Sequence, residues 1–222
     1  MTTTHYQTGL KTQKRLALEH GVDQLGLSCS DEQIDQLLTY LEMLDRWNQA
    51  YNLTAIKDPL KMIGLHLLDS LAVSPMLSGE SCIDVGTGAG LPGIPLAIMN
   101  PNKKFTLLDS NGKKTRFLFQ AKIELKLSNI QEVNTRVEKY LPEHSYDHVL
   151  SRAFSSLSDM VSYCDHLLKT SGSFLALKGR IDKTELSDMP KSYMVDEIHP
   201  LNVPGVDGAR HLIKIVRHRE IT

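Results

Sequence analysis

The residues with the clearest chemical potential form a run of small side chains, Asp84-Val85-Gly86-Thr87-Gly88-Ala89-Gly90. An apolar, strand-like segment precedes this run, and a short apolar helix is expected to follow it over residues 92–100. Glycines let the backbone approach a ligand closely, and a helix N-terminus adds free N–H groups. In an open α/β sheet, ligands bind beyond the carboxyl ends of the strands. The run therefore predicts a ligand-binding loop at that edge of a sheet.

The glycine spacing narrows the class of ligand. Counted from Gly86, the third glycine of a dinucleotide-binding GxGxxG motif would be residue 91, which is Leu91. Counted from Gly88 the motif is present, but that frame begins beyond the expected strand end, and a GxxxxGK[ST] phosphate loop is absent. The observed spacing, with Asp84 before the first glycine, is the pattern of S-adenosylmethionine (SAM) methyltransferases. Asp109 ends the next expected strand, where a carboxylate accepts hydrogen bonds from ribose hydroxyls. A glycine-rich turn can also simply connect a strand to a helix, but the combination with Asp109 favours a site.

Strands and helices alternate around this loop. Strands are expected over residues 81–85, 104–110, 129–135, 146–153, 171–179, 194–203 and 210–218, and helices over 92–100, 112–127 and 157–170. Such alternation predicts a parallel sheet with helices on both faces. The last two strands have no helix between them, which predicts an antiparallel addition at the sheet edge. The expected class is therefore α/β: a Rossmann-like, class I SAM-dependent methyltransferase fold with a mostly parallel seven-stranded sheet.

The N-terminal third has a different pattern. Residues 1–30 are weakly patterned and contain no motif that we can match. Ser30 and Gln33 have the spacing of a capping box, and apolar residues at helical spacing predict an amphipathic helix over 31–50 with an acidic outer face. A further helical periodicity runs over residues 60–77. We expect residues 1–77 to form a helical layer on a SAM-binding domain of residues 78–222, as one structural unit.

The composition limits the class of protein. The chain has 222 residues, of which 41% are hydrophobic and 23% charged, with a net charge of −1. These values are typical of a soluble globular domain. They exclude a disordered chain, a collagen-like fibre and a nucleic-acid-binding protein that is strongly basic over its whole length. The three cysteines form no CxxC, so neither a metal site nor a disulfide framework is indicated. Without a signal-peptide pattern or an apolar run of about 20 residues, a cytoplasmic protein with no membrane partner is expected.

Longer motifs resemble one known family. The matching stretches are RWNQAYNLTAI, HLLDSL, IDVGTGAGLPGIPLAI, LLDSNGKKTRFL, SRAFSSL, ALKG and DGARHL. They resemble the ribosomal RNA small subunit methyltransferase G family, also called the glucose-inhibited division protein B family. The resemblance implies a cytoplasmic enzyme that uses SAM to methylate N7 of guanine 527 in the 530 loop of 16S rRNA. Its expected partner is 16S rRNA within the 30S subunit or an assembly intermediate, and we expect a monomer.

The resemblance also implies cofactor contacts. Gly86 and Leu91 lie in the glycine loop, Val137 and Glu138 follow the third strand where adenine is held, and Arg152 ends the fourth strand beside the transferred methyl group. Asp84, Gly88 and Asp109 complete the expected cofactor set. Each implied contact has a structural alternative. Leu91 is equally compatible with a core position, Glu138 with a solvated surface, and Arg152 with a structural ion pair.

Basic residues concentrate in one segment. Residues 103–126 contain seven basic and two acidic residues, a net charge of +5 in a chain of −1. RNA binding requires local positive charge, so Lys113, Lys114 and Arg116, near the cofactor end of the sheet, are candidate RNA contacts. Arg136 and Arg210 come from other segments and are expected to border the same cleft. Lys122 and Lys126 fit a solvated helix face better.

The expected reaction needs few catalytic groups. Guanine N7 carries a free lone pair, so an in-line methyl transfer requires no general base, and the enzyme supplies proximity and alignment. We therefore assign no proton-transfer residue, and Arg152 is a candidate only for orienting guanine or the cofactor. Phe154 can stack on a base, but an aromatic residue between a strand and a helix is more often part of the core. For His66 and Asn52, substrate contact and capping or packing both remain open. The competing functions are methylation of another RNA, a protein or a small molecule, an NAD(P)-dependent oxidoreductase, and a non-catalytic RNA-binding module.

Overall fold

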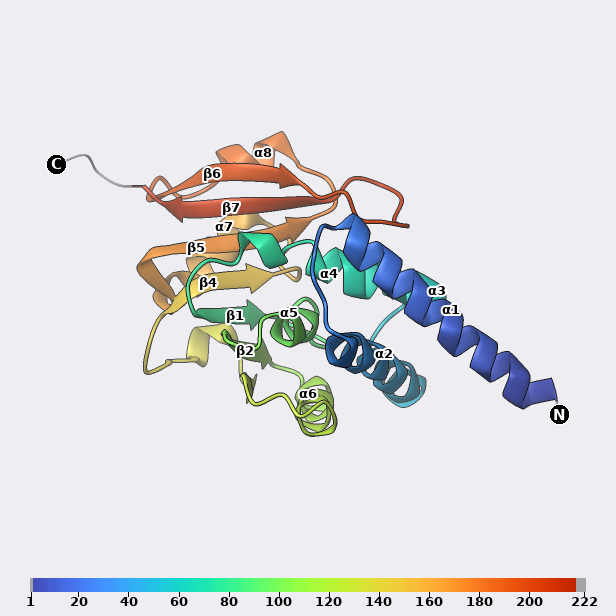
Figure 1. Cartoon of the computed structure of the whole chain (residues 1–222). Coiled ribbons are helices and arrows are strands. Elements are labelled where there is room, and N and C mark those ends of the chain that lie inside the picture. The colour runs from blue at the N-terminus through green and yellow to red at the C-terminus, as the bar shows by residue number, and fades with distance from the viewer. Residues whose placement is uncertain (1, 219–222) are drawn as a thin grey trace.

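Seven strands form a single sheet in the spatial order β3-β2-β1-β4-β5-β7-β6 (Figure 1). The computed structural model describes residues 2–218, with the side chains of residues 9–182 and 184–218. The strands are β1 (Ser81–Val85), β2 (Lys104–Asp109), β3 (Ile130–Asn134), β4 (Tyr146–Ser151), β5 (Leu168–Lys178), β6 (Tyr193–Pro200) and β7 (His211–Arg217). Strands β1 to β5 pair in parallel, and β7 is antiparallel to both β5 and β6. The predicted sheet, including its antiparallel edge, is confirmed.

Helices cover both faces of the sheet. They are α1 (Thr2–Gln24), α2 (Asp31–Tyr51), α3 (Pro59–Met62), the π-helix η1 (Ile63–Leu68), α4 (Asp69–Leu71), η2 (Ser74–Met76), α5 (Gly93–Met99), α6 (Gly112–Glu124), η3 (Val137–Lys139), α7 (Leu157–Cys164), η4 (Asp165–Leu167) and α8 (Lys183–Ser187). Alternate strand residues face opposite sides. Cys82 and Phe105 therefore join the cluster that contains α2, α5 and α6, whereas Ile83 and Leu108 join the cluster that contains α7.

The N-terminal helices share the first of these clusters with the sheet. The predicted capping box is present, since the Ser30 hydroxyl accepts from the backbone N–H of Gln33 and the Gln33 side chain accepts from that of Ser30. The Tyr40 hydroxyl donates to the carbonyl of Ala89 at 2.8 Å, which ties α2 to the glycine loop. Most residues between Thr2 and Met76 are helical, and we propose that this layer forms one structural unit with the sheet. Among the described residues, no helix combines the length and hydrophobicity needed to cross a membrane.

Helix α1 occupies a segment for which the sequence predicted no element. Its apolar residues are few, but Leu18 and Val22 are buried in the shared core. Arg15 forms ion pairs of 2.6 Å with both Asp31 and Asp35 of α2. The acidic face of α2, which the sequence indicated as an outer face, therefore has a partner helix. The hydrophobic periodicity of α1 is a weak signal because few of its residues are apolar and ion pairs supply part of its contact with α2.

Two other helices differ from their predicted form. The helix expected over residues 157–170 ends at Cys164, because Leu168 pairs with Tyr146 and already belongs to β5. The helical run that begins at the N-cap Asp58 changes to a π-helix over Ile63–Leu68 before α4. The short helix α8 follows an Asp182 N-cap and had not been predicted.

Candidate active site

The glycine loop follows β1, and its backbone takes conformations that favour glycine. Gly86 and Gly88 have φ values of +71° and +62°, a region that residues with side chains rarely occupy. The backbone N–H groups of Gly86 and Thr87 donate to the carbonyl of Leu108, which fastens the loop to the end of β2. A Cβ atom on Gly86 would lie 2.6 Å from the Cβ of Ala153. The loop therefore has little space for a side chain at the point where it meets the end of β4.

Asp84 lies behind this loop. Its side chain is fully buried, and its Oδ2 accepts hydrogen bonds from the Thr87 hydroxyl at 2.7 Å and the Gly93 N–H at 2.9 Å. Burial raises the pKa of this carboxyl to about 6, although the two hydrogen bonds act in the opposite direction. Asp84 thus joins the two ends of the loop. Because it has no exposed surface, it shapes the loop and does not itself line the pocket.

Strand β4 meets the loop through Ser151. The Ser151 hydroxyl donates to the carbonyl of Val85 at 2.8 Å and accepts from the N–H of Ala153 at 3.0 Å. This arrangement fixes the direction in which the chain leaves β4. It also sets the backbone of Arg152, the residue between them, next to the glycine loop.

Asp109, at the end of β2, organises the other side of the site. Its Oδ2 accepts from the N–H of Gly88 at 2.9 Å, its Oδ1 accepts from the N–H of Asn111 at 2.9 Å, and Lys114 Nζ lies 3.5 Å from Oδ2. A carboxylate has about four acceptor positions, so these three contacts leave capacity for a ligand hydroxyl. Asp109 is 5% exposed. Its carboxylate is held in one place before any ligand binds.

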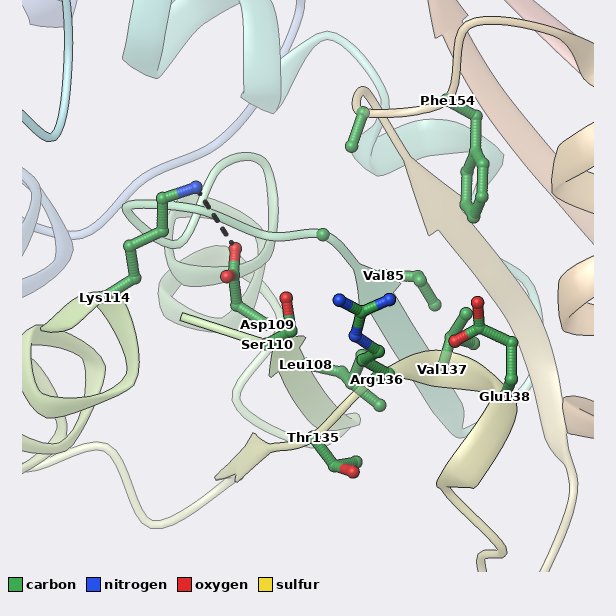
Figure 2. A pocket seen from close by; sticks show the side chains of 12 residues that line it. Val85, Leu108, Asp109, Ser110, Lys114, Thr135, Arg136, Val137, Glu138 and Phe154 are labelled. Carbon is green, nitrogen blue, oxygen red and sulfur yellow. Dashed lines mark hydrogen bonds and ion pairs between the residues drawn. The ribbon is translucent and has the colours of Figure 1, made fainter. Parts of the chain in front are cut away.

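A pocket of about 350 Å³ opens between these elements. In Figure 2 the Lys114–Asp109 pair lies on one side and Glu138 on the other, with the guanidinium of Arg136 between them. Val137 is buried and contributes to the wall, at the start of η3. The lining residues are Val85, Gly86, Leu108, Asp109, Ser110, Lys114, Thr135, Arg136, Val137, Glu138, Ala153 and Phe154. The structure thus brings together residues that the sequence singled out at the ends of three different strands.

Several predicted site residues lie outside this lining. Leu91 is half-buried against the core, and Asp84 and Gly88 contribute to the loop as described above. Lys113 and Arg116 are exposed on the first turns of α6, which starts at the N-cap Asn111. Two further predicted residues, Arg152 and Arg210, meet at Asp69, with Asp69 Oδ2 3.2 Å from Arg152 Nη1 and Asp69 Oδ1 3.3 Å from Arg210 Nε.

Sequence reasoning missed part of the lining. Ser110 and Thr135 directly follow β2 and β3, so their position after a strand was the signal that could have identified them. Phe154 lines the pocket and stacks on Tyr163 with a centroid distance of 6.4 Å, so it has both a packing and a pocket-facing role. Within the described part of the chain, no group of three or more His, Cys, Asp or Glu side chains is arranged to hold a metal ion.

Comparison with known proteins places this geometry in a family. Residues 33–213 match the family model described as rRNA small subunit methyltransferase G. The chain belongs to the rRNA small subunit methyltransferase G family. It is 53% identical over 194 residues to ribosomal RNA small subunit methyltransferase G of Shewanella frigidimarina, covering 87% of this chain and 94% of the relative. The same protein of Marinomonas sp. is 50% identical over 214 residues, which cover 96% of this chain and 99% of that relative.

Solved structures agree on the fold. A precorrin-6y C5,15-methyltransferase from Geobacter metallireducens superposes with a TM-score of 0.52 at 18% identity, over 76% of this chain and 92% of that one. A SAM-dependent methyltransferase from Thiobacillus denitrificans, in complex with S-adenosylhomocysteine, has a TM-score of 0.52 at 11% identity. The match covers 79% of this chain and 98% of that one. The predicted class I methyltransferase fold is confirmed.

The pocket fits SAM by its own chemistry. Gly86 lines the pocket without a side chain, so its backbone is open to a ligand there. At one end of the pocket, Asp109 offers carboxylate oxygens suited to ribose hydroxyls. At the other end, Val137 offers an apolar wall and Glu138 a carboxylate suited to an exocyclic amine.

Proposed function

We propose that this rRNA small subunit methyltransferase G family member transfers the methyl group of SAM to N7 of guanine 527 in the 530 loop of 16S rRNA. Family membership across residues 33–213 carries the proposal, and the pocket at the carboxyl ends of β1, β2, β3 and β4 supports it. When bound, SAM supplies an electrophilic methyl group on a sulfonium. Asp109, Val137 and Glu138 hold the nucleoside part, and the Gly86 loop follows the methionine part.

The roles of the protein groups follow from the nature of the acceptor. Guanine N7 has a free lone pair and loses no proton, so the site needs alignment of the acceptor more than a base. Arg152 supplies a fixed positive charge beside the loop, where it can orient guanine or the cofactor carboxylate. We assign no general base. The proposed surroundings are cytoplasmic, with a monomeric enzyme acting on the 30S subunit or its assembly intermediate.

The chemical identity of the product tests the acceptor atom. The rRNA methylated in vitro is digested to nucleosides, and the labelled nucleoside is compared with synthetic standards. We expect 7-methylguanosine alone. A methyl group on an exocyclic amine, on a ribose or on a pyrimidine would contradict the proposal, because none of these acceptors is the N7 lone pair of guanine. Labelled protein in the absence of labelled rRNA would favour the protein-directed alternative.

The proposed RNA surface begins on α6. Lys113 and Arg116 are exposed at its N-terminal end, while Lys114 and Arg136 line the pocket itself. By contrast, Lys122 pairs with Glu132 at 3.3 Å near the far end of the helix. Positive charge is therefore available for phosphates on the side of α6 nearest the pocket.

Replacement of both Lys113 and Arg116 by alanine is expected to weaken rRNA binding more at low salt than at high salt. Each lost phosphate contact reduces the slope of log K against log salt, by about 0.7 per contact for single-stranded RNA. Filter binding from 50 to 300 mM KCl measures the slope. The matched control is Lys104→Ala with Lys122→Ala, which removes the same charge at the other end of the sheet and should leave the slope unchanged. A loss of affinity that does not vary with salt would show that these are not phosphate contacts.

A further inference from the structure

Asp69 links two arginines that are far apart in the sequence. Its two carboxylate oxygens each face one guanidinium, Oδ2 that of Arg152 and Oδ1 that of Arg210. The Asp69 side chain is 6% exposed, whereas those of Arg152 and Arg210 are 32% and 29% exposed. A guanidinium has five N–H donors, so each arginine keeps donors that Asp69 does not use. The pair is anchored on a buried carboxylate and still open to a ligand.

The π-helix positions Asp69 for this contact. The N–H of Asp69 donates to the carbonyl of Gly64, five residues earlier, which is π-helical spacing. Such insertions change the direction in which the following side chains point, and they occur often at functional sites. The Ser70 hydroxyl donates to the carbonyl of His66 at 2.6 Å, and His66 Nε2 lies 2.8 Å from the Thr54 hydroxyl. The turn that carries Asp69 is therefore fixed by hydrogen bonds on both sides.

The loop that carries Arg210 rests on the same π-helix. A Cβ added to Gly64 would lie 3.0 Å from Val206 and 3.5 Å from the carbonyl oxygens of Pro204 and Gly205. The absence of a side chain at residue 64 lets the 204–206 segment approach closely. Arg210 then reaches Asp69 from one side, while Arg152 reaches it from the end of β4.

The electrostatics of the cluster favour an anion. Two arginines and one aspartate leave one positive charge in excess, on side chains that are partly exposed. Burial raises the pKa of Asp69, and the positive charges of Arg152 and Arg210 oppose that shift. Burial lowers the pKa of the neighbouring His66, which favours its neutral form. Because Ala153 lines the cofactor pocket, the excess charge on Arg152 lies at the border of that pocket.

We propose that Asp69 is a positioning residue that holds Arg210 against Arg152, so that Arg210 binds an rRNA phosphate at a fixed distance from the cofactor pocket. The inference rests on the proposed function in that the acceptor is rRNA. Without the Asp69 carboxylate, the two guanidiniums repel each other and the Arg210 side chain loses its ion-pair partner. The phosphate of the bound RNA then loses its alignment with the methyl donor.

Three variants test this role: Asp69→Asn, Arg210→Gln and the double variant. Each single variant is expected to lower kcat/KM for the rRNA substrate by about 10- to 100-fold, because small displacements in alignment have effects of this size. The dissociation constant for SAM is expected to stay within about threefold of wild type. The kcat/KM of the double variant is expected to be at most about threefold below that of the less active single variant, because Asp69 acts through Arg210. Multiplied losses, or a parallel loss of SAM affinity, would overturn the proposal.

Two controls separate positioning from folding. Asp165→Asn breaks a more exposed aspartate–arginine pair, with Arg217, next to the start of β5 and away from the pocket, and should leave kcat/KM unchanged. Asp69→Glu keeps the charge and moves the carboxylate by one methylene. It therefore replaces Asp69→Asn as the test of positioning if Asp69→Asn does not fold. Its kcat/KM is expected to fall by about 3- to 10-fold. A wild-type value for Asp69→Glu, in a protein with an unchanged melting temperature, would refute the role.

Binding of 16S rRNA in the presence of S-adenosylhomocysteine gives a readout that needs no turnover. Asp69→Asn and Arg210→Gln should both weaken this binding, and more at low salt. If the wild-type protein binds rRNA but transfers no methyl group, the proposed function is wrong. The comparison of rRNA affinities between wild type and variants still decides the role of Asp69. Unchanged RNA affinity in both variants would contradict the role even if the wild-type enzyme is active.

Discussion

Replacement of Gly86 by aspartate is expected to abolish measurable SAM binding. The added Cβ would lie 2.6 Å from the Cβ of Ala153, and the backbone has φ +71°, which disfavours any side chain. The new carboxylate would also enter the space along which the cofactor approaches the loop. We expect at least a 100-fold increase in the dissociation constant, on the order of 3 kcal/mol, measured by isothermal titration calorimetry.

Gly26→Asp is a matched control for this variant. Gly26 has φ +68° but no atom within 4 Å of an added Cβ, and it lies between α1 and α2. The control therefore introduces the same backbone strain and the same charge without the steric contact. It should lose some thermal stability and bind SAM normally. Normal SAM binding by Gly86→Asp, or an equal loss in both variants, would refute the proposed loop.

Replacement of Asp109 by alanine is the second change with a large expected effect. It removes the acceptor for the N–H groups of Gly88 and Asn111 and the partner of Lys114. Hydrogen bonds to a charged group contribute about 1.5–3 kcal/mol each. The loop would lose its connection to β2, and the proposed ribose acceptor would be absent. We expect SAM affinity to fall by at least about 100-fold in equilibrium dialysis with labelled cofactor.

Asp147 offers an unusually close control for Asp109. It accepts from the backbone N–H groups of Glu80 and Ser81 at 3.0 Å each and pairs with Lys169 at 2.7 Å, at the amino end of β1. These hydrogen bonds lower the pKa of Asp147, against the effect of its partial burial. Asp147→Ala should lower the melting temperature and leave SAM affinity within about twofold. Comparable SAM affinities for the Asp109 and Asp147 variants would contradict the assigned role of Asp109.

The sheet was predictable from the sequence because its central strands are short apolar runs followed by turn residues. The loop after β1 was predictable for a related reason, since glycine spacing reports backbone conformation directly. Helix α1 was not, because only a few of its residues, such as Leu18 and Val22, are buried in the core, so its hydrophobic periodicity is weak. The end of α7 was misplaced because pairing of Leu168 with Tyr146 depends on a distant strand.

The site was predictable where it depends on strand ends. Asp109, Val137 and Glu138 follow or end successive parallel strands, which meet at one edge of the sheet, and the structure brings them into one pocket. The role of Asp69 was not predictable. It depends on a π-helix and on contacts with Arg152 and Arg210, neither of which is near it in the sequence. Local patterns contain no information on such a tertiary ion-pair cluster.

The most direct test of the account is transfer of a tritium-labelled methyl group from SAM to 30S subunits purified from a strain that lacks the cognate methyltransferase. We predict stoichiometric incorporation that maps to a single guanine of the 530 loop, with no incorporation into subunits from the parent strain, which already carry the methyl group. Naked 16S rRNA and assembly particles, assayed in parallel, identify the preferred form of the substrate. Incorporation at another nucleotide, or none into any of the three substrates by a protein that binds SAM, would contradict the account.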